Sequence, residues 1–165
     1  MRYLIILAIT AAWLNFNGAV NHLQPPHTRG GAISSVGISN IKFSGDETAV
    51  YNRVGVVIGW IKDAIVFNYE GNKALAFIDK QDVFSFAYGN AYLGQFHNGF
   101  FRDKTGNAVA WVRGASGGPI TLPPLDRVAP IFMPVIKPIT PIVTTITPIE
   151  TLSWSNQSWD DFLGR

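Results

Sequence analysis

Between residues 49 and 114 the chain repeats one short pattern four times, and this repeat constrains the fold more than any other feature of the sequence. Each repeat has a glycine at its centre, flanked by segments rich in β-branched and aromatic residues. Glycine tolerates positive φ angles, so we expect a tight turn between two strands in each repeat. The repeats therefore predict four β-hairpins: VYNRVGVVIGWI (50–61), VFNYEGNKALAFI (66–78), FSFAYGNAYLGQF (84–96) and FRDKTGNAVAWV (101–112), with turns at Gly55, Gly71, Gly89 and Gly106.

In every repeat, the same position of the strand that follows the turn holds a very small residue. A single hairpin buries too little to be stable in water, whereas four similar hairpins can bury one another's faces. Strands that meet near a common axis would be crowded, and only Gly or Ala would leave room there. We therefore predict an all-β domain at 49–114 in which four β-hairpin repeats surround a pseudo-four-fold axis. The small residues expected at its centre are Gly59, Ala76, Gly94 and Ala110.

The composition changes after Gly114. Residues 115–149 are rich in proline, which excludes a helix and favours polyproline II, so this segment is predicted to be an extended Pro-rich arm. Residues 150–165 form an aromatic C-terminal hook, in which Ser158 and Asp161 resemble a capping box at the start of a helical turn. The hook either packs on its own domain or binds another molecule through Trp154, Trp159, Phe162 and Leu163.

The N-terminal region looks like a targeting segment and a linker. Arg2 precedes an apolar run from Tyr3 to Leu14, which is too short to span a bilayer as a helix but typical of a secretory signal. We predict a signal peptide or short anchor at 1–19, a linker at 20–48 and an exported or envelope-associated bacterial protein, with no membrane span beyond that segment. The formal charge of +2 is spread along the chain, so no nucleic-acid partner is expected.

Candidate reactive residues have no partners at suitable spacings. The chain has no cysteine, and His22 and His27 lack further metal ligands close in sequence. Ser116 lies in GASGG, but the prolines that follow exclude the helix that a nucleophile elbow requires. The acids Asp63, Asp79, Asp82 and Asp103 fall at hairpin ends or beside turns, where Asp caps the backbone. We therefore expect no catalytic, cofactor-binding or metal-binding residues and no enzyme activity.

The order of these parts resembles the four-fold β-flower domain proteins of bacteria. The resemblance rests on the hairpin repeats, the RGASGGP junction (113–119), the Pro-rich tract (123–142) and the tail LSWSNQSWDDFL (152–163). Short Gly-aromatic repeats also occur in WG-type and YD-type repeat proteins, which remain alternative assignments. The family resemblance implies the fold but no reaction or ligand.

The function expected from these features is a non-catalytic interaction or structural module. In this hypothesis the C-terminal arm and hook bind an unknown protein partner or a second copy of the chain. The alternative is a glycan- or peptide-binding domain that uses exposed aromatic residues as a platform, for which the candidates are Trp60, Phe77 and Trp111. The same three side chains could instead be packed inside the domain.

Overall fold

The structure is a computed structural model that describes residues 47–87, 89–142, 144 and 146–165. The predicted signal peptide or anchor at 1–19, with His22, His27 and almost all of the predicted linker, lies outside the described residues. The described elements are β1 (Thr48–Tyr51), β2 (Val57–Lys62), β3 (Ile65–Phe67), β4 (Ala74–Asp79), β5 (Asp82–Ser85), β6 (Tyr92–His97), β7 (Phe100–Arg102), β8 (Ala108–Val112) and α1 (Trp159–Phe162).

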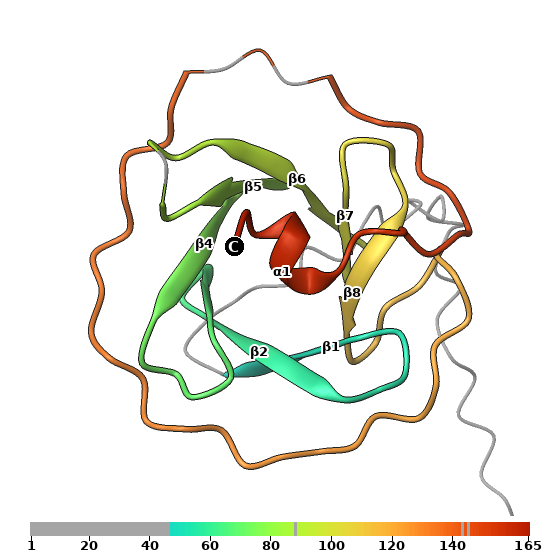
Figure 1. Ribbon diagram of the computed structural model, residues 1–165, viewed down its shortest axis with the longest axis horizontal. Coiled ribbons are helices and arrows are strands. Elements are labelled where there is room, and N and C mark those ends of the chain that lie inside the picture. Colours follow the sequence, from blue (N-terminus) through green and yellow to red (C-terminus); the bar gives the residue numbers. More distant parts are fainter. Residues whose placement is uncertain (1–46, 88, 143, 145) are drawn as a thin grey trace, which may run out of the picture. The chain divides into compact units, whose positions relative to one another are not determined.

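The eight strands form one closed antiparallel barrel (Figure 1). Each strand pairs with the next along the chain, and β8 pairs with β1 to close the barrel. The predictions of an all-β fold and of β-hairpins are confirmed. The turns fall at the predicted glycines, and all four have positive φ angles, from 65° at Gly89 to 88° at Gly106.

The first strand of each hairpin carries one register shift close to its end. The shifts lie at Val50/Tyr51, Val66/Phe67, Val83/Phe84 and Phe101/Arg102. A bulge of this kind bends and twists a strand, which helps a short sheet to close on itself. The sequence places these shifts four to six residues before the central glycine of each repeat, so each hairpin bends before its turn.

Glycine is required at Gly59 and Gly94 because another strand approaches closely. A Cβ atom at Gly59 would lie 2.7 Å from the carbonyl oxygen of Phe67 on β3. A Cβ atom at Gly94 would overlap the carbonyl oxygen of Arg102 on β7. The small residues at these two positions therefore make room for the backbone of the neighbouring hairpin. The crowding at Gly59 and Gly94 thus comes from the adjacent strand, and the approach of all four strands to a common axis stays a prediction.

The two faces of the barrel belong to two hydrophobic clusters. One cluster holds Ile61, Ile78, Phe96 and Val112 together with residues of the C-terminal tail. The other holds the outward-facing aromatic residues and packs against Ala129, Phe132 and Val135 of the Pro-rich segment. Side chains alternate between the faces of a strand, so consecutive residues such as Trp60 and Ile61 enter different clusters.

Residues 115–149, here called the belt, run around the outside of the barrel (Figure 1). The belt contains no helix among its described residues. It is held at the hairpin turns by hydrogen bonds: Leu125 N donates to Gly55 O at 2.8 Å, and Met133 N donates to Gly71 O at 3.1 Å. At the third turn Asn90 Nδ2 donates to Ile139 O at 3.5 Å. The Pro-rich segment thus follows its own barrel from turn to turn.

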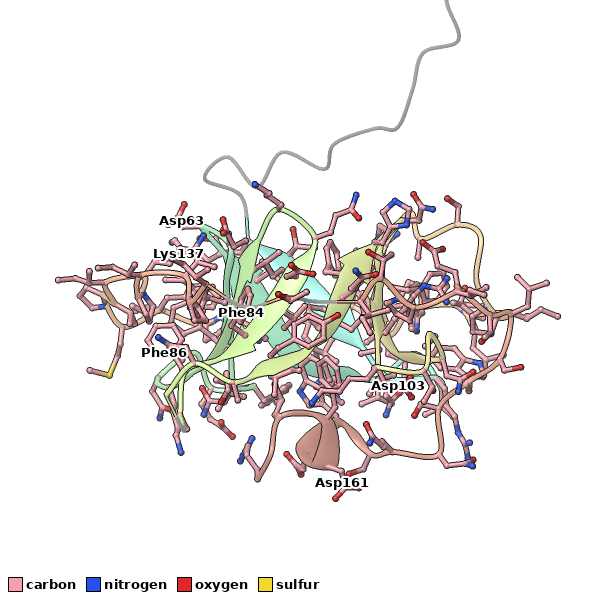
Figure 2. All side chains as sticks on the ribbon, turned by 90° about the horizontal axis from the view of Figure 1, so that it is seen from above. Asp63, Phe84, Phe86, Asp103, Lys137 and Asp161 are labelled. Carbon is pink, nitrogen blue, oxygen red and sulfur yellow. The ribbon has the colours of Figure 1, made fainter. Side chains whose placement is uncertain are left out.

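Residues 150–165, the tail, continue from the belt and cover one end of the barrel with α1 (Figure 2). Thr151 N donates to Gly106 O at 3.2 Å, which fixes the tail at the fourth turn. The predicted capping box is present: Asp161 N donates to Ser158 Oγ, and Ser158 N donates to Asp161 Oδ2. The hydrogen bonds that the hydroxyl and the backbone N of Ser158 donate to Asp161 Oδ2 lower the pKa of Asp161. The cap sets the start of α1 and thereby directs Phe162 toward the barrel.

Candidate functional site

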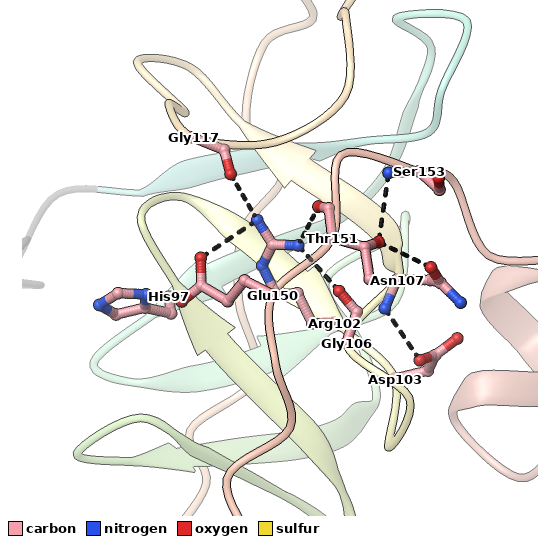
Figure 3. A network of polar contacts seen from close by, with 9 residues as sticks. All are labelled: His97, Arg102, Asp103, Gly106, Asn107, Gly117, Glu150, Thr151 and Ser153. Atoms are coloured by element: carbon pink, nitrogen blue, oxygen red, sulfur yellow. Dashed lines mark hydrogen bonds and ion pairs between the residues drawn. The ribbon is translucent and has the colours of Figure 1, made fainter.

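Arg102 on β7 joins the two ends of the belt to the barrel (Figure 3). Its side chain is completely buried. Nη2 donates to Gly117 O near the start of the belt, and Nη1 donates to Thr151 O just beyond its end, both at 2.9 Å. Nη1 also donates to Gly106 O in the fourth turn, at 2.9 Å. One guanidinium therefore determines where the belt leaves the barrel and where it returns.

Glu150 partly balances the buried charge of Arg102. Its Oε2 lies 3.4 Å from Nη2 of Arg102, and its Oε1 contacts Nδ1 of His97 at the end of β6. Burial lowers the pKa of Arg102, and the nearby Glu150 carboxylate opposes this shift. The Nε atom of Arg102 has no hydrogen-bond partner within the described part of the chain. The cluster is consistent with a structural joint, because carbonyl oxygens occupy most of its donors.

Asp103 organises the fourth turn beside this joint. Its Oδ1 accepts hydrogen bonds from the backbone and hydroxyl of Thr105 and from Asn107 N, as expected for an Asp in a turn. Its Oδ2 accepts from the hydroxyl of Ser155 in the tail at 2.5 Å. Burial would raise the pKa of Asp103, but the hydrogen bonds from Ser155 and Thr105, with those from the turn backbone, outweigh burial and lower it.

The outward face of the belt is covered by apolar side chains. Within each of three stretches they recur every third residue, the repeat of a polyproline II helix. Large exposed apolar patches are rare on soluble monomers and mark interaction sites. Most of these residues are more than four-fifths exposed, and we call the whole set the outer rim. It consists of Ile120, Leu122, Leu125, Val128, Ile131, Met133, Ile136, Ile139, Ile142, Ile146, Ile149 and, at the start of the tail, Leu152.

Of the three charged residues of the belt, Lys137 and Asp126 pair with groups outside the belt, whereas Arg127 is exposed. Lys137 Nζ donates to Ile78 O at 2.9 Å and lies 5.7 Å from the ring centroid of Phe77, so its charge faces the barrel. Asp126 contacts Tyr51 and Arg113, whose hydrogen bonds lower the pKa of Asp126. Figure 2 shows the Lys137 side chain on the belt beside the barrel.

The predicted ligand platform lies beneath the belt. Trp60, Phe77 and Trp111 are 3%, 0% and 4% exposed. Trp60 packs edge-on against Phe132 of the belt, and Trp111 Nε1 donates to Asn52 O at 2.7 Å. In the structure these three side chains are therefore packed inside the domain, which the sequence left open as the alternative to a ligand platform. They do not form an exposed aromatic surface in this conformation.

The predicted partner-binding residues of the tail pack on the same chain. Phe162 and Leu163 are 3% and 2% exposed and belong to the core cluster of the barrel. Trp159 stacks on Phe162 with ring centroids 5.7 Å apart, and Trp154 packs edge-on against Phe100. Binding of a partner by these residues remains a prediction.

The described residues contain no cluster of three or more histidine, aspartate or glutamate side chains that could hold a metal ion. Within the same part of the chain, no helix has the length and apolar character needed to cross a membrane. Ser116 lies at the junction to the belt, and its backbone N donates to Asn98 O at 2.9 Å.

Sequence reasoning missed Arg102, and for the apolar residues between the prolines it predicts only that they lie on a surface or against another chain. Arg102 has a visible signal: among the four repeats, only this one has a charged residue directly after the first apolar position, where the others have Tyr51, Phe67 and Ser85. The outer rim also has a signal, the three-residue spacing of Ile, Val and Leu between the prolines. Neither pattern indicates which side of the belt faces the barrel.

Comparison with known proteins supports the architecture. A family model described as 4-fold beta flower protein matches residues 48–163, which includes the barrel, the belt and α1. Comparisons with curated proteins and with solved structures found no significant match. Because the family match covers well over half of the chain and spans every described element, the chain belongs to the 4-fold beta flower protein family.

Proposed function

We propose that this chain is a non-catalytic interaction module whose docking surface is the outer rim. The observation that carries the proposal is the row of exposed aliphatic side chains along the belt. Exposing such a surface to water is unfavourable, by about 25 cal/mol for each Å² of apolar area that a partner would cover. A conformation that buries the barrel's aromatic residues while leaving these aliphatic residues outside is suited to binding.

The tail and Arg102 have a supporting role in this proposal. The tail packs α1 against the barrel, and Arg102 holds both ends of the belt. A belt fixed at its ends and at the turns loses little conformational entropy on binding, which favours affinity. The partner is a protein with an apolar surface or another copy of this chain.

We also propose that the hairpins are related by a pseudo-four-fold axis and that the protein is exported. The recurring register shifts and the belt contacts at successive turns support the first part. The axis would give the outer rim several similar arcs, so that one partner type could bind at more than one place. The apolar run after Arg2 supports export. Fractionation of the native cell and N-terminal sequencing of the mature protein test export.

Site-specific photocrosslinking in the native host tests the docking surface. A photoreactive amino acid at Ile136 or Ile139 is expected to give an adduct of one defined mass. The same amino acid at Lys104, an exposed residue of the fourth turn that does not belong to the outer rim, serves as the control. The triple variant Ile136→Ser, Ile139→Ser, Ile142→Ser should fold and should lose the interaction. Equal adduct yields at the rim and at Lys104 would contradict the proposal.

A further inference from the structure

A cavity of about 560 Å³ opens beside α1, apart from the outer rim. It lies between the first hairpin turn and the tail. Ile58 and Val109 contribute apolar surface, and Trp154 and Trp159 line the cavity from the tail. Its volume falls within the range of small-molecule sites, about 300–1,000 Å³. The size and the mixture of aromatic and apolar surface suit a small organic ligand.

The walls of this cavity are fixed before any ligand binds. Asn52 Oδ1 accepts hydrogen bonds from the backbone of Val54 and Val56, which fixes the first turn. Ser155 Oγ donates to Asp103, and Gln157 N donates to Ser155 Oγ, which fixes the tail on the other side. Both indoles pack against phenylalanines of the fold. A preformed site loses less entropy on binding than one that must be ordered.

Polar side chains with free hydrogen-bonding capacity surround the opening. Arg53, Asn156 and Gln157 line the cavity and are exposed. Within the described residues, none of their side chains has a hydrogen bond or ion pair. Two amides and a guanidinium provide several donors and two carbonyl acceptors. Since none of the described residues that line the cavity carries a carboxylate, the cavity favours a neutral or negatively charged ligand over a cation.

Other ligand classes fit this surface less well. A peptide could not bind by strand addition, because each strand of the closed barrel already has two neighbours. Single-stranded nucleic acid needs a positively charged groove along its backbone, whereas Arg53 is the sole charged lining residue in the described chain. A sugar has apolar C–H faces that pack on indole and hydroxyl groups that pair with amides and guanidinium.

We infer that this cavity is a carbohydrate-binding site, in which the tail indoles contact a sugar ring while Arg53, Asn156 and Gln157 bind its hydroxyl or carboxylate groups. The site is independent of the outer rim: it is built from the first turn and the tail, and its residues do not belong to the belt. It also differs from the Trp60, Phe77 and Trp111 platform, which lies beneath the belt.

Titration of the full chain with three defined tetrasaccharides tests this inference: chitotetraose, maltotetraose and tetragalacturonate, followed by tryptophan fluorescence and calorimetry. At least one is expected to bind saturably with a dissociation constant below about 1 mM. The double variant Asn156→Ala, Gln157→Ala and the single variant Arg53→Ala should each weaken that binding about tenfold or more, with unchanged thermal unfolding.

Arg127→Ala is the matched control, because Arg127 is another exposed arginine but lies on the belt. Its affinity for the bound tetrasaccharide should equal that of the unaltered chain. Absence of saturable binding to all three sugars overturns the inference. Binding that survives both cavity variants also overturns it, because the sugar would then occupy another place. Loss of photocrosslinking at the outer rim would leave these results unaffected, so the two proposals fail separately.

Discussion

The guanidinium of Arg102 donates a hydrogen bond to the carbonyl oxygen of Thr151 at 2.9 Å, and this contact joins β7 to the first residues of the tail. Because the same guanidinium also binds Gly117 O, the belt has both of its ends at a single side chain. The relationship explains how a Pro-rich segment with few hydrogen bonds of its own can stay against a barrel.

Replacing Arg102 should therefore loosen the belt and destabilise the fold. In Arg102→Gln the carbonyl oxygens of Gly106, Gly117 and Thr151 lose charged donors, and Glu150 loses its buried counter-charge. We expect the free energy of unfolding to fall by about 3–5 kcal/mol, as for other broken buried charge networks. Urea denaturation measures the loss.

The exposed Arg113 is the control for Arg102. It also pairs with an acid, Asp126, but both side chains are more than half exposed. Arg113→Gln should change the stability little, since exposed ion pairs contribute little. Equal losses for the two variants would mean that Arg102 is not the residue that holds the belt.

Glycine at position 106 is required by the close approach of the end of the belt as well as by its backbone conformation. Its φ is +88°, and a Cβ atom there would overlap the carbonyl oxygen of Ile149. Gly106→Ala should therefore displace the end of the belt and increase proteolysis within it. Gly89 also has a positive φ, +65°, but a Cβ atom there meets nothing within 4 Å. Gly89→Ala should lower the free energy of unfolding by about 1–2 kcal/mol, because alanine must adopt the left-handed conformation, and should leave proteolysis of the belt unchanged.

Acid should weaken the attachment of the tail through Asp103. The folded-state pKa of Asp103 is lowered, so its ionised form stabilises the fold above the unfolded-state pKa. This contribution is lost as the pH falls through the folded-state pKa. This contribution to the free energy of unfolding should therefore stay constant from neutrality to about pH 5 and decrease as the pH falls below that. Asp103→Asn should be less stable near neutrality and should show a shallower decrease; an unchanged slope would contradict the assignment.

Phe162 should contribute strongly to stability because it fills the barrel end. Phe162→Ala removes a side chain that is 3% exposed and that contacts Phe101 with ring centroids 6.4 Å apart. The expected loss is about 3–5 kcal/mol, typical of a buried phenylalanine. Asp160→Ala, on the exposed side of the same helix, should have little effect. Thermal unfolding of both variants shows whether packing of the tail contributes to the stability of the fold.

The sequence by itself determined the local conformations. Gly55, Gly71, Gly89 and Gly106 specify turns because positive φ is costly for other residues, and the flanking β-branched and aromatic residues specify strands. Ser158 and Asp161 specify the start of α1, and the prolines exclude helix from the belt. These features depend on neighbours a few residues away, so they can be predicted from one sequence.

Only the tertiary structure decided which surfaces are covered. Trp60 and Ile136 are both large apolar residues in suitable segments, yet the belt buries Trp60 and leaves Ile136 91% exposed. The path of the belt depends on contacts between distant residues, such as Leu125 with Gly55 and Arg102 with Gly117 and Thr151. Local pattern does not encode these pairings, because burial is a property of the whole fold and not of one segment.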